Sequence, residues 1–417
     1  MNFDFNKGIL QIELPKIIDP NNANVVEEAL KLMPNLKDAK EVTMNAENLV
    51  YISSLGLRAI LKFLKAYKGK PVTIFNVSPE VYEIFNQTGF TSLLKVVKKF
   101  RKVDVEGMEL IGAGMYGAVY RINAEQILKI FYGIDSELEI LPVIETIRTA
   151  FIHDIPTIIP FEIVRTEKGI GIILELLNSE MMSTLMNKNP EKFDKYVSDM
   201  VTLIKTLSQT VLDEGTLRSR KEMLLSKLDN AETFLTAEEI ATIKNYINVV
   251  PDRNTAVHGD LHAKNIMIMN DRPVLIDMDE FSCGHPVWDI GNFYFIYYLL
   301  PHLEPKIAED LLGIAGKMPY PDFYKQIIAF TFAEAADIWD KFFNEYFADY
   351  SSEEKKLILE IVDFYGTFKF VTFLIDGCNG SKDNAKIANN VKHIRRFLAK
   401  LEKKNIENLI KSLDILK

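Results

Sequence analysis

The feature that most constrains the fold is a dense polar segment, HGDLHAKN at 258–265, followed by IDMD at 276–279. A short apolar run leaves Asn265, and after an Asn-Asp turn signal a second apolar run leads to Asp277. A β-hairpin over this stretch sets Asp277 beside Asn265. Their oxygen atoms suit a hard cation such as Mg²⁺, and the carboxylate of Asp260 is left to handle a proton.

The pattern H-G-D-x-H-x-x-N, followed by a hairpin that ends in I-D, resembles the catalytic and metal-binding loops of the aminoglycoside phosphotransferase and choline kinase group. That group has a protein-kinase-like fold. The alternative is a loop rich in histidine and aspartate with a capping aspartate, but several spacings agree at once. The resemblance implies that Asp260 accepts the proton of a hydroxyl acceptor, that Asn265 and Asp277 hold Mg²⁺, and that His258 supports the loop. Asp279 is a secondary candidate, for the metal or for a cap.

A second histidine, His262, lies two residues after Asp260, where serine/threonine protein kinases usually carry lysine. This difference favours a small-molecule kinase, with His262 as a catalytic candidate. A zinc site at His258 and His262 would lack a third ligand and a helical H-E-x-x-H frame. The segment GHPVWDIG at 284–291 resembles the G-x-P-x-x-D-x-A element of the same group, which implies that Asp289 braces the catalytic loop.

A glycine-rich segment, LIGAGMYGAVYRI at 110–122, precedes an expected strand at 127–131. Two strands around the glycines indicate a β-hairpin lid over a triphosphate, whereas a Rossmann turn would open a helix. Lys129 shares a strand face with Ile127 and Phe131, so it needs an anionic partner such as ATP phosphates and a helix glutamate. The residues expected to bind ATP are Gly112, Gly114, Gly117, Val119, Lys129 and Glu145, with Lys129 also a catalytic candidate. The resemblance further implies a hinge at which backbone groups of Glu175 and Leu177 meet the adenine, and the alternative there is a plain buried strand.

The glutamate that pairs with Lys129 is expected on a helix over about 136–152, which Pro142 could kink or split. The family's usual position falls on Val143. Glu145 is nearest and is favoured, and Glu139 lies one turn before Val143.

The first hundred residues alternate expected strands and helices, which indicates a small α/β domain. The segments VYISSLGLR at 50–58 and VYEIFNQTGF at 81–90 resemble STAS domains, the anti-sigma-factor-antagonist family. By position, Ser54 matches the serine that is phosphorylated in partner-switching members, and a helix N-terminus favours a phosphate. Ser53 stands where many members carry aspartate. The alternative is that both serines only cap the helix; in either case the domain is expected to bind a protein partner and to perform no chemistry.

The composition excludes several classes of protein. A formal net charge of −9 argues against a nucleic-acid-binding protein. Two cysteines provide neither a disulfide framework nor metal-ligand spacing. The N-terminus has no apolar signal region, and the longest apolar run, about 293–300, is too short to cross a bilayer, so a cytoplasmic protein without a membrane segment is expected.

The expected architecture is an α/β STAS domain followed by an α+β, protein-kinase-like bilobal domain. The STAS domain is placed at 1–100, an antiparallel β N-lobe at 101–178, and a mostly helical C-lobe with the catalytic loop and the acceptor site at 179–417. The predicted function is ATP- and Mg²⁺-dependent transfer of the γ-phosphate to a hydroxyl of a small molecule, regulated through the STAS domain. The alternatives are a protein kinase that acts on a serine, such as Ser54 of its own STAS domain, and a nucleotide-binding sensor without catalysis.

A predicted acidic helix face is relevant to the charge of the acceptor molecule. Glu334, Asp337 and Asp340 are three residues apart and lie near Trp339 in the sequence. An acidic and aromatic wall would suit a cationic acceptor such as an amino sugar or choline. The alternative is an ordinary solvated helix face.

Overall fold

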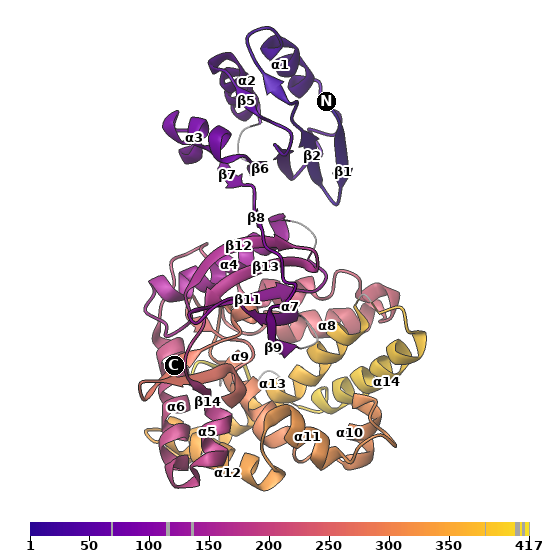
Figure 1. The fold of residues 1–417 in the computed structure, drawn as a ribbon. Helices are drawn as coiled ribbons and strands as arrows, with labels where there is room; N and C mark the ends of the chain where they lie inside the picture. Colours follow the sequence, from indigo (N-terminus) through magenta and orange to yellow (C-terminus); the bar gives the residue numbers. More distant parts are fainter. Residues whose placement is uncertain are drawn as a thin grey trace. The chain divides into compact units, whose positions relative to one another are not determined.

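The computed structural model describes residues 1–67, 70–113, 117–134, 137–379, 381–404, 409–410 and 413–416 (Figure 1). The chain forms two compact units. The first contains residues 1–142 and 161–174, and the second contains residues 143–160 and 175–417.

The first unit begins with a five-stranded sheet in the order β1-β2-β4-β6-β7. β1 is antiparallel to β2, and the remaining neighbours are parallel. Its strands are β1 (Phe3–Asn6), β2 (Ile9–Glu13), β4 (Glu41–Asn45), β6 (Val72–Val77) and β7 (Lys95–Lys98). Parallel strands need helical crossovers, and these are α1 (Ala23–Lys31), α2 (Ser54–Ala66) and α3 (Pro79–Gln87). A short parallel pair, β3 (Ile17–Ile18) and β5 (Tyr51–Ile52), precedes α2. The predicted α/β fold of this part is confirmed.

Alternating strand residues and the apolar stripes of the helices share one core. Val42 and Met44 of β4 are fully buried, as are Ile60 of α2 and Phe85 of α3. At the start of α2 a Cβ atom on Gly56 would lie 2.6 Å from the Ile18 side chain. This position therefore requires glycine.

The rest of the first unit contains a six-stranded sheet in the order β8-β12-β13-β11-β10-β9. Its strands are β8 (Arg101–Lys102), β9 (Glu109–Ala113), β10 (Gly117–Arg121), β11 (Gln126–Phe131), β12 (Pro160–Thr166) and β13 (Gly169–Glu175). β9, β10 and β11 are consecutive antiparallel strands. The described residues of the glycine-rich segment therefore lie mostly on the paired strands β9 and β10, as predicted. α4 (Glu137–Ile152) follows with Pro142 inside it.

The second unit is mostly helical. Its helices are α5 (Met182–Lys188), α6 (Phe193–Gln209), α7 (Arg220–Ser226), α8 (Ala237–Asn248), α9 (Val287–Tyr294), α10 (Pro305–Leu312), α11 (Tyr320–Ile328), α12 (Phe332–Tyr346), α13 (Ser352–Cys378) and α14 (Asn384–Leu401). Two small sheets accompany them: β14 (Glu180–Met181) with β16 (Ile266–Met269) and β17 (Arg272–Leu275), and β15 (Ala256–Val257) with β18 (Ser282–Cys283). Among the described residues, no helix has both the length and the apolar character needed to cross a membrane.

α9 and α13 approach each other closely because each has a glycine at the crossing. A Cβ atom on Gly366 of α13 would lie 2.8 Å from the Tyr294 ring and 3.1 Å from the carbonyl oxygen of Gly291 in α9. Beside this contact, the Trp288 and Tyr365 rings pack edge to face with centroids 5.2 Å apart. This contact places α13 next to the start of α9.

We expect Gly366→Ala to lower the thermal midpoint of the second unit, because the methyl group has no space and overpacking costs about 1–3 kcal/mol. Thermal unfolding followed by circular dichroism measures the effect. Glu360→Ala in the same helix is the control, since Glu360 is exposed. Equal midpoints for the two variants would contradict the close contact.

Candidate active site

The hairpin predicted after the polar segment is present. β16 and β17 are antiparallel, with Ile266 opposite Leu275 and Met269 opposite Arg272. Asn270 and Asp271 connect them, with φ angles of 51° and 61°. Two consecutive residues in the left-handed region are typical of a type I′ turn, which matches the twist of the flanking strands.

The hairpin places the two predicted metal ligands at its open end. The Ile276 N–H donates to the carbonyl oxygen of Asn265 at 2.9 Å, so Asp277 directly follows the residue bonded to Asn265. The Asn265 amide donates from Nδ2 to the carbonyl oxygen of Asp260 at 2.9 Å. This bond fixes the amide and leaves Oδ1 as its acceptor atom. Asp277 has φ 60°, a conformation uncommon for a residue with a side chain, and such residues cluster at functional sites.

His258 connects the two halves of this site. Its side chain is fully buried. Nδ1 accepts the N–H of Asp260 at 3.3 Å, and Nε2 lies 3.2 Å from the carbonyl oxygen of Ile276. Because Nδ1 accepts, the ring proton is on Nε2 and donates to Ile276. The imidazole thus ties the backbone of Asp260 to the residue before Asp277.

Asp289, in the first turn of α9, binds the backbone of the same loop. Its carboxylate accepts the N–H of His258 at 2.8 Å and the N–H of Gly259 at 2.7 Å. Burial raises the pKa of Asp289, while the nearby imidazole and the two N–H donors oppose that shift. Asp289 thus bonds two consecutive backbone N–H groups of this loop, and its bracing role stays a prediction.

Gly259 is required for steric reasons. Its φ is 82°, and a Cβ atom would lie 2.7 Å from Nη1 of Arg220 and 2.8 Å from the carbonyl oxygen of Glu280. The Arg220 side chain is almost completely buried and forms an ion pair with the Glu280 carboxylate at 2.5 Å. An ion pair therefore packs directly against the loop glycine.

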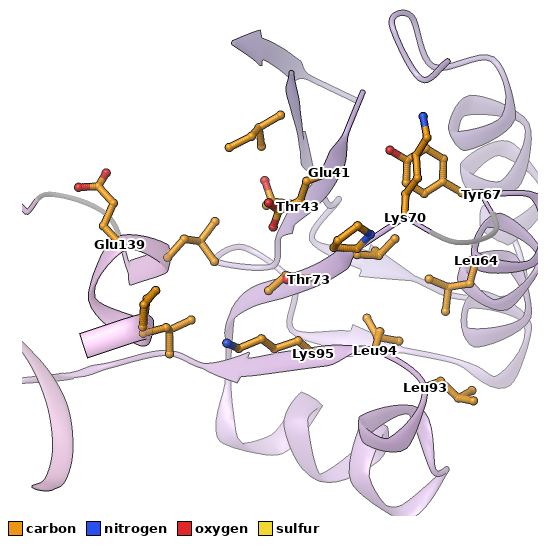
Figure 2. A pocket seen from close by; sticks show the side chains of 16 residues that line it. Glu41, Thr43, Leu64, Tyr67, Lys70, Thr73, Leu93, Leu94, Lys95 and Glu139 are labelled. Carbon is orange, nitrogen blue, oxygen red and sulfur yellow. The ribbon is translucent and has the colours of Figure 1, made fainter. Parts of the chain in front are cut away.

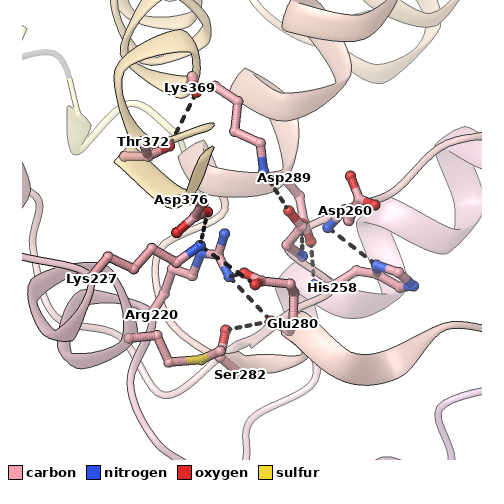
Figure 3. Close-up of polar contacts among 12 residues, drawn as sticks. Arg220, Lys227, His258, Asp260, Glu280, Ser282, Asp289, Lys369, Thr372 and Asp376 are labelled. Atoms are coloured by element: carbon pink, nitrogen blue, oxygen red, sulfur yellow. Dashed lines mark hydrogen bonds and ion pairs between the residues drawn. The ribbon is translucent and has the colours of Figure 1, made fainter. Parts of the chain in front are cut away.

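The Arg220–Glu280 pair belongs to a larger charged network (Figure 3). Lys227, the residue after α7, lies 3.5 Å from the Glu280 carboxylate and 2.6 Å from that of Asp376 in α13. Lys369 of α13 donates to the carbonyl oxygen of Gly259 at 3.2 Å. No local sequence pattern marks these residues, because α7, the segment after the hairpin and α13 are far apart in the chain.

The network perturbs the pKa of Glu280. Burial alone would raise the pKa of this carboxyl, but the charges of Arg220, Lys227 and Lys369 together hold it well below its usual range. Glu280 is therefore ionised at all but strongly acidic pH. Its negative charge offsets part of the positive charge of Arg220, Lys227 and Lys369.

His262 and Asp260 lie side by side at the mouth of the loop. Nε2 of His262 is 3.8 Å from Oδ2 of Asp260, whose side chain is 44% exposed. Nδ1 of His262 accepts the N–H of Lys264 at 3.3 Å. Burial lowers the pKa of His262, so at neutral pH the ring is uncharged and presents an N–H toward Asp260.

The residues predicted to bind the nucleotide fall partly in the first unit. Val119 of β10 is opposite both Lys129 and Gly112. A Cβ atom on Gly117 would lie 2.2 Å from the carbonyl oxygen of Ile130, so this position also requires glycine. The ammonium of Lys129 lies 4.9 Å from the centre of the Phe131 ring, on the strand face opposite the buried Leu128. Gly114 is outside the described residues.

The remaining nucleotide candidates lie in the second unit. The Glu145 carboxylate accepts from Arg148 at 3.0 Å on an exposed helix surface. Glu175 is bonded to Ile159 through its own N–H at 3.0 Å and through its carboxylate at 3.3 Å. Leu177 is buried. The partner of Lys129 therefore stays a prediction.

The acidic helix face differs from expectation in one respect. Glu334, Asp337 and Asp340 are exposed on α12, and the Glu334 carboxylate caps the helix by accepting the Thr331 N–H at 2.7 Å. Trp339 is 3% exposed and packs against other aromatic rings in the core. The expected aromatic part of an acceptor wall is therefore wrong, because helical periodicity turns Trp339 away from the acidic face.

The two serines at the start of α2 have different environments. Ser53 is buried and is the N-cap: its hydroxyl accepts the Gly56 N–H at 3.2 Å. Ser54 is the first helical residue and is exposed. Capping is thus done by Ser53, and Ser54 is left accessible.

The first unit also contains a pocket of about 780 Å³ (Figure 2). Thr43 and Thr73 of the five-stranded sheet line it together with Lys70, Lys95 and Glu139. The Thr43 hydroxyl is buried and has no partner among the described residues. The pocket contains none of the residues predicted to carry chemistry apart from Glu139, the second candidate for pairing with Lys129.

Comparisons with known protein families find a match for each of two regions of the chain. Residues 1–104 match the family model of the STAS domain, and residues 201–322 match that of the phosphotransferase enzyme family. No curated protein matches the chain.

Similar solved structures include a choline/ethanolamine kinase family protein from Mesorhizobium loti, with 13% identity and a TM-score of 0.42 over 74% of this chain and 92% of that chain. Another is ADP-bound aminoglycoside phosphotransferase APH(2'')-Ib, with 17% identity and a TM-score of 0.43 over 78% of this chain and 99% of that chain. A third is a thermostable mutant of APH(4)-Ia in complex with ADP and hygromycin B, with 10% identity and a TM-score of 0.45 over 72% and 95%.

The Glu280 network predicts a specific dependence of stability on pH. Because the pKa of Glu280 is lower in the folded state than the ordinary 4.5, its ionised form stabilises the fold above that pH. This contribution is lost as the pH falls below about 4.5 toward the folded-state pKa. Glu280→Gln should therefore be less stable than the wild type at pH 7 and should lose less stability on acidification.

Urea unfolding between pH 3 and pH 7 tests this expectation. Glu214→Gln is the control, because Glu214 is exposed in a loop. A pH profile of Glu280→Gln parallel to that of the wild type would contradict the account.

Proposed function

Because the chain joins a STAS domain to a region of the phosphotransferase enzyme family, we propose that it is a kinase that uses ATP and Mg²⁺ to phosphorylate a hydroxyl of a small molecule, under regulation by the STAS domain. The observation that carries the proposal is the hairpin that sets Asp277 next to Asn265, whose side-chain amide is bonded to the backbone of Asp260. We place the STAS domain at 1–100, the N-lobe at 101–178 and the C-lobe at 179–417.

The donor set fits Mg²⁺. This ion prefers oxygen ligands and is usually held by one or two protein groups, with phosphates and water completing its shell. Asn265 offers Oδ1, since its Nδ2 is already bonded, and Asp277 adds a carboxylate. Among the described parts of the chain there is no cluster of three histidine, cysteine or acidic residues of the kind that holds zinc. When bound, Mg²⁺ would neutralise phosphate charge as it develops.

The protein groups around the acceptor have distinct roles. The half-exposed carboxylate of Asp260 accepts the proton of the acceptor hydroxyl. The uncharged His262 directs an N–H toward that carboxylate and orients it. His258 and Asp289 keep the loop in place, since each bonds backbone groups of the residues around Asp260. In the first unit the glycine hairpin and Lys129 are proposed to bind the ATP phosphates.

The neutral state of His262 favours a small molecule as the acceptor. Serine/threonine protein kinases usually have a charged lysine at this position, whereas here the ring nitrogen Nδ1 is used by the Lys264 N–H and the ring is uncharged. The exposed acidic residues of α12 are compatible with a cationic acceptor, but Trp339 takes no part.

A second candidate function is phosphorylation of Ser54 in the protein's own STAS domain. The observation in its favour is the exposure of Ser54 at the first position of α2, where free N–H groups stabilise a phosphate.

We expect Asp260→Asn to retain ATP affinity within about twofold and to lose turnover by about 10²–10⁴-fold, since the amide cannot accept the proton. Calorimetry with Mg·ATP and a coupled ADP assay against amino sugars, choline, nucleosides and methylated sugars measure the two quantities. Asp271→Asn, in the hairpin turn, is the control for a nearby loss of charge. Wild-type turnover in Asp260→Asn would remove Asp260 from the base role.

The two candidate functions differ in where the label from [γ-³²P]ATP goes. We expect label in the small-molecule fraction once an acceptor is supplied, and equal protein-bound label in the wild type and Ser54→Ala. Loss of protein-bound label in Ser54→Ala, with retention in Ser53→Ala, would instead favour self-phosphorylation.

A further inference from the structure

One cation of the charged network differs from the others. Arg220 and Lys227 both form ion pairs with carboxylates. The ammonium of Lys369 forms no ion pair within the described part of the chain, and its one hydrogen bond is to the carbonyl oxygen of Gly259. Burying an ammonium that bonds only to one carbonyl oxygen costs free energy. Two of its three N–H groups lose their hydrogen bonds to water and gain no described protein acceptor in exchange.

Lys369 extends from α13 toward Asp289 and Asp260 (Figure 3). It lies one helical turn after Gly366, where α13 contacts Gly291 of α9. That contact fixes the start of the Lys369 side chain relative to Asp289. The ammonium and Asp289 then hold opposite ends of the same residue, since Gly259 donates its N–H to Asp289 and accepts from Lys369 through its carbonyl.

The catalytic loop itself brings no cation to Asp260. His262 is uncharged at neutral pH because burial lowers its pKa. Lys264 is turned away, with its ammonium bonded to the carbonyl oxygen of Ile327 at 2.9 Å. Among the residues of the second unit that the structure describes, Lys369 is therefore the lysine that bonds to this loop and forms no ion pair with a carboxylate.

We propose that Lys369 is an anion-binding residue of the active site, which contacts the phosphoryl group as it moves to the acceptor beside Asp260. The inference rests on the proposed function. In the transfer the acceptor oxygen forms a bond to the γ-phosphorus, the bond from that phosphorus to the bridging oxygen breaks, ADP leaves with the electron pair, and the acceptor proton passes to Asp260. Lys369 stabilises the negative charge on the phosphoryl oxygens and exchanges no proton.

The charges around Lys369 support this role. Burial lowers the pKa of Lys369, and the carboxylates of Asp260 and Glu280 oppose that shift. Glu280 forms an ion pair with Arg220, and Asp376 forms one with Lys227. Neither carboxylate is therefore left to pair with Lys369. A phosphoryl group would supply the missing anionic partner. An anionic substituent of the acceptor would present the same chemistry, and the experiment separates the two sources.

The test compares two probes in the full-length wild type and Lys369→Met. Mg·ADP with aluminium fluoride mimics the phosphoryl group in transfer. Inorganic phosphate added to the complex with Mg·AMP-PNP, in which the γ-position is filled, reports an anion on the acceptor side. We expect Lys369→Met to bind Mg·ADP alone within about twofold of the wild type and to bind the aluminium fluoride complex about 10–100-fold more weakly, the range for loss of a hydrogen bond to a charged group.

Controls separate binding from folding. Lys356→Met removes an exposed lysine of the same helix and should bind both probes like the wild type. Lys369→Arg keeps the charge and should recover part of the aluminium fluoride affinity, which a purely structural role would not require. Thermal midpoints confirm that each variant is folded.

The outcomes are distinct. A weaker aluminium fluoride complex assigns Lys369 to the transferred phosphoryl group, and weaker phosphate binding alone assigns it to an anionic group of the acceptor. If Lys369→Met binds both probes like the wild type, the inference is wrong while the proposed function stands. If the wild type fails to bind Mg·ADP, the proposed function itself fails.

Discussion

The arrangement of the site depends on the peptide backbone at Gly259. Its N–H is held by the buried carboxylate of Asp289, its carbonyl oxygen by the ammonium of Lys369, and its α-carbon has no room for a side chain. Asp260 is the next residue, so these contacts fix its backbone while its carboxylate stays half exposed. A carboxylate held by a fixed backbone in this way is suited to the base role that we propose for Asp260.

The sequence predicted the parts of this site that are local. The apolar runs on either side of an Asn-Asp turn were enough to predict the hairpin, and the hairpin brings Asn265 to Asp277. The bracing role of Asp289 was predicted from a resemblance, and the structure shows its carboxylate bonded to the N–H groups of His258 and Gly259. Arg220, Glu280 and Lys369 could not be predicted, because their side chains meet only after α7, α9 and α13 have packed. The prediction that Trp339 lines an acceptor site was wrong for a related reason. Its neighbours in the sequence are acidic and exposed, whereas its own helical position faces the core.

In the STAS domain, too, the order of strands and helices could be predicted from the sequence, but a detail of the backbone conformation could not. Alternating strands and helices predicted its α/β fold, and the serine pair marked the start of α2. Which serine caps the helix depends on where the backbone first becomes helical, a matter of one residue that periodicity does not decide. The structure gives the cap to Ser53, so any modification of Ser54 would leave that hydrogen bond intact.

The central claim is that the hairpin and its loop form a site for phosphoryl transfer from a metal nucleotide. A crystal structure of the chain with Mg·AMP-PNP tests it most directly. The account predicts Mg²⁺ at about 2.1 Å from Oδ1 of Asn265 and from the carboxylate of Asp277, with the γ-phosphorus facing Asp260. A nucleotide bound without contact to these residues, or a metal held by other side chains, would contradict it.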